Sequence, residues 1–216
     1  MPMPLEFDDK TFRYRDTETG KFVPHTQVKS QSEEIATRLQ NRLLKRTKQL
    51  ENGVISLEDW KDFMKNAMKE AHIVSGTLGA GGKNYLNKNP EYKSRTFGVI
   101  GNELKNQYKA LDKFAEQIKN GTQTPAQIEA RVKHYGLGAN QSFSKTHQAI
   151  RISRAEKRGK RLLARRWVNS GNPCADCVGH STNGAWLNAS VVVPPGNACV
   201  CRGRCQCGIA YREVKG

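Results

Sequence analysis

Apolar residues recur every three or four positions through most of the chain, a spacing that predicts a mainly α-helical protein. Four helices are predicted at about residues 32–50, 57–75, 95–120 and 125–135. Ser56 and Thr124 stand where N-caps are expected, and Pro125 takes the first helical position. The glycine-rich run at residues 76–82 predicts a flexible joint between helices. A last helix is expected from about Ser142 to Trp167.

Shorter alternating segments flank this helical region. Residues 11–23 alternate apolar and polar side chains around Thr19-Gly20, which predicts a β-hairpin or an extended arm. Near the C-terminus, residues 191–193 and 209–211 are predicted strands on either side of a turn at 194–196. The expected organisation is therefore an N-terminal arm or hairpin (1–28), a helical body ending in a basic helix (29–168) and a cysteine-rich module (169–216).

The predicted last helix carries a concentration of positive charge. Its arginines repeat at intervals of three or four residues and would form one stripe on a helix surface. Such a stripe is locally unfavourable, which suggests a partner that neutralises it: DNA phosphate or an acidic protein surface. A solvated helix face is the alternative. The candidate contact residues are Arg151, Arg154, Arg158, Arg161 and Arg165.

Composition supports a protein that depends on partners. The formal net charge is +16, only 37% of residues are hydrophobic, and the mean hydropathy is −0.71. This excess of positive charge favours an anionic partner. No secretory signal and no segment able to cross a bilayer is visible, so a reducing cytosol and no membrane association are expected.

All six cysteines lie between Cys174 and Cys207. A CxxC pair followed after a loop by closely spaced cysteines is typical of a four-thiolate structural zinc site. The predicted ligands are Cys174, Cys177, Cys201 and Cys205, with Cys207 and then Cys199 as substitutes. Disulfides and free thiols are the alternatives, the former disfavoured in a reducing compartment.

Catalysis finds little support in the sequence. The five histidines are scattered, and neither a Ser-His-Asp arrangement nor a pair of carboxylates stands out. His180 lies near the CxxC pair but is expected to be an ordinary surface histidine. The chain is therefore predicted not to be an enzyme.

The C-terminal motif resembles a known family. Trp167, the CxxC pair, Asn183-Gly184, Pro194-Pro195-Gly196 and Cys199-x-Cys201 are similar to the C-terminal module of phage head morphogenesis proteins of the Mu protein F type. That module commonly has a histidine shortly after its paired prolines, where this chain has Gly196-Asn197-Ala198. Thiolate from the additional pair Cys205-Gln-Cys207 would replace it in a metal site.

The resemblance implies a structural virion component rather than an enzyme. A minor head protein would associate with the portal or other head and neck proteins, and with packaged double-stranded DNA. It would form a homo-oligomer in a particle assembled in the bacterial host cytoplasm. A head–tail connector or adaptor ring is the alternative within this class. A free nucleic-acid-binding zinc protein is the alternative from another class.

Overall fold

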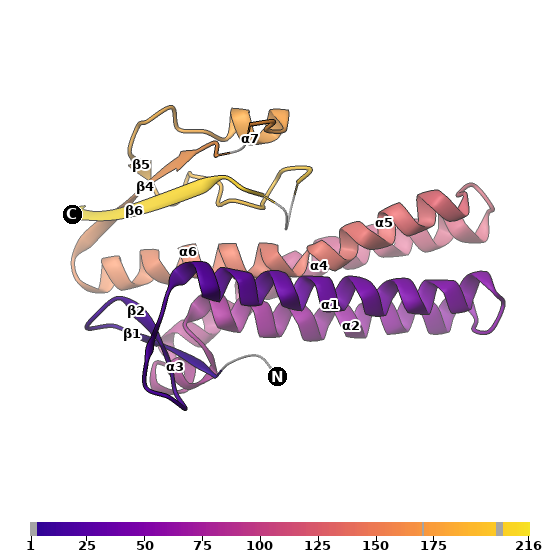
Figure 1. Cartoon of the computed structure of the whole chain (residues 1–216), viewed down its shortest axis with the longest axis horizontal. Helices are drawn as coiled ribbons and strands as arrows, with labels where there is room; N and C mark the ends of the chain where they lie inside the picture. The colour runs from indigo at the N-terminus through magenta and orange to yellow at the C-terminus, as the bar shows by residue number, and fades with distance from the viewer. Residues whose placement is uncertain (1–3, 170, 202–204) are drawn as a thin grey trace.

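The computed structural model describes residues 4–169, 171–201 and 205–216, and the protein is mainly α-helical as predicted (Figure 1). A helical body is flanked by a small N-terminal sheet and by a C-terminal module that combines a second sheet with the cysteines. The helices are α1 (His25–Glu51), α2 (Leu57–Ala80), α3 (Lys83–Lys88), α4 (Glu91–Lys119), α5 (Pro125–Leu137), α6 (Ala139–Lys157) and α7 (Ala175–Gly179). The strands are β1 (Leu5–Asp8), β2 (Arg13–Asp16), β3 (Phe22–Val23), β4 (Lys160–Trp167), β5 (Leu187–Asn188) and β6 (Gly208–Lys215).

The apolar stripes of the predicted helices form the core of the body. Leu43 of α1, Trp60 and Met64 of α2, and Leu111 and Phe114 of α4 are all buried in one cluster. The Trp60 indole N–H donates to the Thr47 hydroxyl at 3.0 Å, so its polar atom is satisfied within the core. Each helix therefore obtains its stability from its neighbours rather than from propensity alone.

The N-cap predicted at Ser56 is present at the start of α2 and forms a capping box with Asp59. The Ser56 hydroxyl accepts the Asp59 N–H at 3.1 Å, and the Asp59 carboxylate accepts the Ser56 N–H at 3.4 Å. Replacing Ser56 with alanine is expected to lower the free energy of unfolding by about 1 kcal/mol, because an N-terminal N–H loses its acceptor. Urea denaturation measures this change. Thr37→Ala is the matched control: this exposed hydroxyl only donates to the Glu33 carbonyl within α1, so its loss should be close to neutral.

The glycine-rich run is not a flexible joint, and that prediction is wrong. Helix α2 continues through it to Ala80, and the chain turns only at Gly81 and Gly82, whose φ angles are +121° and +95°. A Cβ on Gly79 would lie 2.3 Å from the Phe143 carbonyl oxygen of α6. Glycine is needed there because two helix backbones approach closely, not because the chain bends.

The N-terminal hairpin is present and belongs to a three-stranded antiparallel sheet of order β1-β2-β3. Tyr14 pairs with Val23 across the predicted hairpin and with Phe7 of the additional strand β1. The sheet packs on the body: Phe7 and Tyr14 share a buried cluster with Tyr85 and Ile150, and the Tyr14 hydroxyl donates to the Leu78 carbonyl at 3.0 Å.

The predicted last helix is two elements, so a continuous helix to Trp167 is wrong. Helix α6 ends at Lys157, and Gly159 (φ +65°) reverses the chain in the left-handed conformation common after helix ends. Residues 160–167 then form β4, which pairs antiparallel with β5 and β6 in a sheet of order β5-β4-β6. The predicted strand at 209–211 lies within β6, whereas 191–193 is not a strand. In the described ranges, no helix combines the length and apolar character needed to span a membrane.

Candidate metal centre

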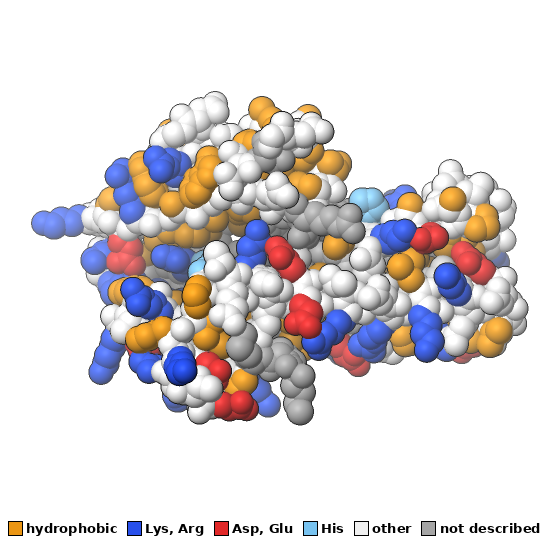
Figure 2. Space-filling model, in the orientation of Figure 1, with side chains coloured by type: hydrophobic (Ala, Val, Ile, Leu, Met, Phe, Trp, Pro, Cys, Tyr) orange, Lys and Arg blue, Asp and Glu red, His pale blue; other side chains and the backbone are white. Residues whose placement is uncertain are grey.

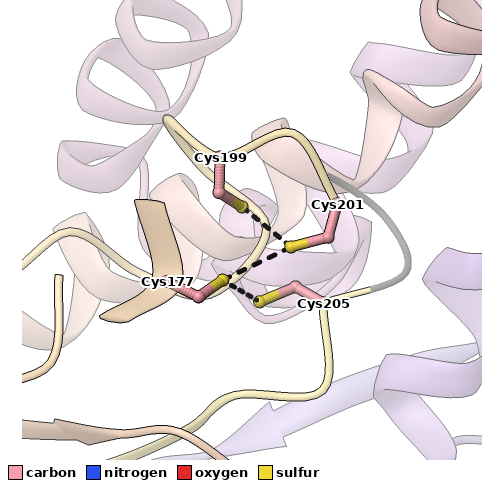
Figure 3. Close-up of side chains that lie close together, drawn as sticks. All are labelled: Cys177, Cys199, Cys201 and Cys205. Atoms are coloured by element: carbon pink, nitrogen blue, oxygen red, sulfur yellow. Dashed lines mark hydrogen bonds between the residues drawn. The ribbon is translucent and has the colours of Figure 1, made fainter. Parts of the chain in front are cut away.

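Four cysteine sulfurs converge in the C-terminal module (Figure 3). Cys177 comes from the short helix α7, and Cys199, Cys201 and Cys205 come from the loop that precedes β6; all four sulfurs lie within 4.8 Å of one another. Cys177 Sγ is 3.4 Å from Cys201 Sγ and 3.7 Å from Cys205 Sγ, and Cys199 and Cys201 sulfurs are 3.2 Å apart. A tetrahedral zinc with sulfur ligands needs S–S separations of roughly 3.8 Å. The four side chains could therefore hold a metal ion.

The convergent set differs from the predicted ligands at one position. Cys177, Cys201 and Cys205 are included, but Cys199 takes the place assigned to Cys174. Cys174 is the N-cap residue of α7 and is half-buried, with its sulfur 3.9 Å from that of Cys201. A single residue between Cys199 and Cys201 is enough because the loop turns sharply there. All six cysteines are free thiols, and sulfurs 3.2 Å apart are well beyond the disulfide length of about 2.05 Å.

The loop that carries Cys199 and Cys201 is held in place by two side chains, one within α7 and one at its C-cap. The Asp176 carboxylate accepts the Val200 N–H at 3.0 Å, and His180 Nε2 lies 2.8 Å from the Ala198 carbonyl oxygen. Ala198 has a φ of +47°, an unusual conformation for a residue with a Cβ. These contacts keep Cys199 and Cys201 facing Cys177, so His180 positions the loop rather than joining the sulfur cluster.

Arg166 of β4 is fully buried beside the sulfurs. Its Nη1 donates to the Val193 carbonyl at 2.7 Å, and its Nη2 lies 3.5 Å from Cys177 Sγ and 4.0 Å from Cys205 Sγ. A buried cation needs an anionic partner. Thiolates of a metal-bound cluster would supply it, and N–H donation to sulfur would stabilise the ionised form that binds metal.

The thiol pKa values indicate which protons a bound metal would have to displace. Burial raises the pKa of Cys177 and the pKa of Cys201 well above the ordinary thiol value. Burial also acts to raise the pKa of Cys205, but backbone hydrogen bonds from Cys207 and Gly196 outweigh it and lower this pKa to about 7. Without a metal, the first two thiols keep their protons at neutral pH, so a bound metal must displace them.

Acid is therefore expected to release the metal. At least two displaced protons make the metal affinity fall by about a hundredfold or more for each pH unit, and Cys205 adds another proton below its pKa of about 7. Competition with a chelator between about pH 8 and about pH 6 measures this slope. Calorimetry in buffers of different ionisation enthalpy should detect the released protons independently. A pH-independent affinity would show that the metal is held by groups already ionised, and not by these thiols.

The predicted contact arginines do not lie on one helix surface. Arg154 is buried, with its Nε donating to the Tyr85 hydroxyl at 2.9 Å and lying 3.3 Å from the Asp9 carboxylate. Arg158 forms an ion pair with Glu213. Arg151 lies over the Tyr211 ring at 4.8 Å, in a cavity between α6 and the N-terminal sheet. The stripe was inferred from helical spacing, which ends at Lys157.

Two of the predicted contact arginines, Arg161 and Arg165, do share a surface, and a third arginine that was not predicted, Arg212, lies on it too. On β4, Arg161 and Arg165 alternate with the buried residues, and Arg212 of β6 pairs opposite Leu163 on that same face. Arg165 and Arg212 lie over the Trp186 ring at 5.2 and 4.5 Å. We call Arg161, Arg165, Arg212 and Trp186 the cationic face. Figure 2 shows Lys and Arg side chains on this module as well as on the body.

The sequence contained a signal for Arg166 that helical spacing obscured. Leu162, Ala164 and Arg166 are the buried positions of β4, and they alternate with more exposed residues. Period-two alternation after Gly159 indicates a strand with an arginine on its buried face.

Comparisons of the chain with protein-family models, with curated proteins and with solved structures find no match.

Proposed function

We propose that this chain is a structural phage virion protein, a minor head or portal-proximal component whose C-terminal module is ordered by one zinc ion. The observation that carries the proposal is the convergence of Cys177, Cys199, Cys201 and Cys205 from two separate segments. These segments are the ones whose motif resembles the head morphogenesis module.

Zinc is the metal that best suits this donor set. Four thiolates in tetrahedral arrangement are typical of structural zinc sites, whereas a catalytic zinc usually keeps one position open for water. The buried Arg166 would offset part of the negative charge of four thiolates around a divalent ion. The cluster therefore supports a structural role for the metal and not an enzymatic one.

The thin C-terminal module is the part that depends on the metal. Apart from the cysteines, its apolar core consists mainly of Leu162, Ala164, Ala189 and Val192 packed on Ala155 of α6. A structural zinc contributes on the order of 10 kcal/mol to ordering such a module. Zinc binding would fix the cationic face relative to the body, ready for an acidic portal surface or for packaged DNA.

Virion membership is tested with purified particles of a phage or prophage that encodes the chain. Mass spectrometry should find the chain in DNA-filled heads in few copies, together with the portal protein. A sharp ring of about a dozen subunits in the native assembly would favour the adaptor reading. Particles that are complete and infectious without the chain would contradict a virion role.

A free nucleic-acid-binding zinc protein is the second candidate, and the cationic face favours it. Arginines beside an aromatic ring suit phosphate contacts and base stacking. This reading predicts that the purified chain binds double-stranded DNA with a steep loss of affinity as salt rises. The double variant Arg165→Gln/Arg212→Gln should weaken binding, whereas Arg38→Gln, on the exposed surface of α1, should not. Failure to bind DNA at low salt would eliminate this candidate and assign the face to a protein partner.

A further inference from the structure

A second concentration of positive charge lies in an open cavity of about 430 Å³ between the N-terminal sheet, the start of α1 and α6. Its polar lining comes from three elements: Arg13 of β2, His25 at the first position of α1, and His147 and Arg151 of α6. No Asp or Glu is among the described residues that line this cavity. Its net charge is therefore positive and has no internal counter-ion.

The basic groups of the cavity lack the partners that buried polar groups normally have. His147 is only 6% exposed, and within the described chain its imidazole contacts other rings but has no hydrogen-bond partner. Its ring centroid is 4.8 Å from that of His25. Among the described residues, neither Arg13 nor Arg151 has an ion-pair partner; each instead lies over an aromatic ring. Of these groups only His147 is buried, and a buried polar side chain without a partner indicates a missing ligand.

The electrostatic environment agrees with this geometry. Burial, followed by the charges of Arg151 and Lys29, lowers the pKa of His25. Burial, together with His25 and Arg151, holds the pKa of His147 well below its ordinary value. The cavity thus disfavours further positive charge, as expected for a site that is complementary to an anion.

The start of α1 adds to the same field. Its N-cap is Pro24, which offers no side-chain acceptor, and its first turn contains no acidic residue. The free N–H groups of a long helix carry partial positive charge and are a common binding site for phosphate. Here that N-terminus opens on the cavity together with the unpaired His147.

Aromatic rings at the cavity favour a nucleotide over a simple carboxylate. Phe12 and Phe22 line the cavity and are 48% and 41% exposed. Phe12 also has a φ of +57°, a conformation that a bulky residue rarely adopts and that tends to occur at functional positions. Exposed rings beside arginines are a typical platform for a base next to its phosphate, and the volume suits a nucleotide.

We propose that this cavity binds the phosphate group of a nucleotide, either free or within a nucleic acid strand. Arg13 and Arg151 would pair with phosphate oxygens, the α1 N-terminus and the two imidazoles would donate further hydrogen bonds, and Phe12 or Phe22 would contact the base. The proposal does not rest on virion membership or on a bound metal, although His25 and His147 also line a neighbouring cavity that reaches Cys205 and Cys207.

Calorimetry on the metal-loaded chain, residues 1–216, at low ionic strength tests the proposal with inorganic phosphate, adenosine 5′-monophosphate and adenosine. Both phosphate compounds should bind, and adenosine should bind at least about tenfold more weakly than its monophosphate. Tighter binding of the nucleotide than of inorganic phosphate would support a nucleotide ligand. Equal binding of the two would overturn the nucleotide assignment. Absence of binding by both phosphate compounds would overturn the proposal.

Variants locate the binding. Arg13→Gln changes an exposed side chain, so folding should be retained, and the dissociation constant should rise about tenfold or more. Arg151→Gln should act in the same direction. Arg38→Gln removes the same charge from an exposed ion pair elsewhere on α1 and should change affinity by less than about twofold. An equal loss with Arg13→Gln and Arg38→Gln would show only general charge attraction. The NMR signals of His25 and His147 should shift with added phosphate; unmoved signals would place any binding elsewhere.

Discussion

Replacing Cys199 with serine is expected to release the metal and to disorder the C-terminal module while the helical body stays folded. Cys199 supplies one of four convergent sulfurs, and serine is a poor substitute for a thiolate ligand of zinc. Because metal binding contributes on the order of 10 kcal/mol to a module with little apolar core, the module should lose its fixed structure. Elemental analysis should show a fall from about one zinc per chain to near zero.

The matched control is Cys174→Ser, which alters a cysteine beside the cluster but outside the convergent set. This variant should keep its metal and its resistance to proteolysis. Cys177→Ser should behave like Cys199→Ser under either ligand assignment. The reverse result, with metal lost in Cys174→Ser and retained in Cys199→Ser, would restore the ligand set expected from the sequence. Metal-free wild-type protein with intact disulfides would reject a metal site altogether.

Gly79→Ala is expected to destabilise the helical body by about 2 kcal/mol or more, although alanine is the better helix former. The added methyl group would lie 2.3 Å from the Phe143 carbonyl oxygen and 2.5 Å from the Thr146 hydroxyl. These atoms belong to a packed helix, so α2 and α6 must move apart and lose apolar contact. Urea denaturation followed by circular dichroism measures the change.

Gly98→Ala, the same substitution at another helical position, is expected to stabilise the protein instead of destabilising it. Gly98 lies within α4 and a Cβ there meets no atom within 4 Å. The change should raise the free energy of unfolding by about 0.5–1 kcal/mol, because alanine has less conformational freedom to lose. If both variants were stabilised, the close approach of α2 and α6 would be wrong, and the glycine-rich run would be flexible after all.

The helical body was predictable because its signals are local. A stripe of apolar side chains at three- and four-residue spacing defines a buried helix face wherever the partner helix lies. Ser56 and Thr124 cap their helices through contacts three residues away, and both capping boxes are present in the structure. The N-terminal hairpin was predictable for the same reason, because its turn and its alternation of apolar and polar residues lie within about a dozen residues of the sequence.

Predictions failed where one stretch of sequence is compatible with two structures. Arginine repeats at 151–165 satisfy helical spacing, yet Gly159 ends the helix and the remaining residues alternate as a strand. Glycines in α2 are equally consistent with a joint and with close packing. Only the position of Phe143 distinguishes these possibilities at Gly79.

By itself, the sequence determined the helical class, the cap positions and the presence of six closely spaced cysteines, because each depends on neighbours a few residues apart. Tertiary structure decided which sulfurs meet, that Arg166 is buried against them, and that Arg13, His25 and Arg151 share a cavity. These last features join residues separated by more than a hundred positions in some cases. Spacing along the chain cannot specify such distances, since the packing of many side chains fixes them together.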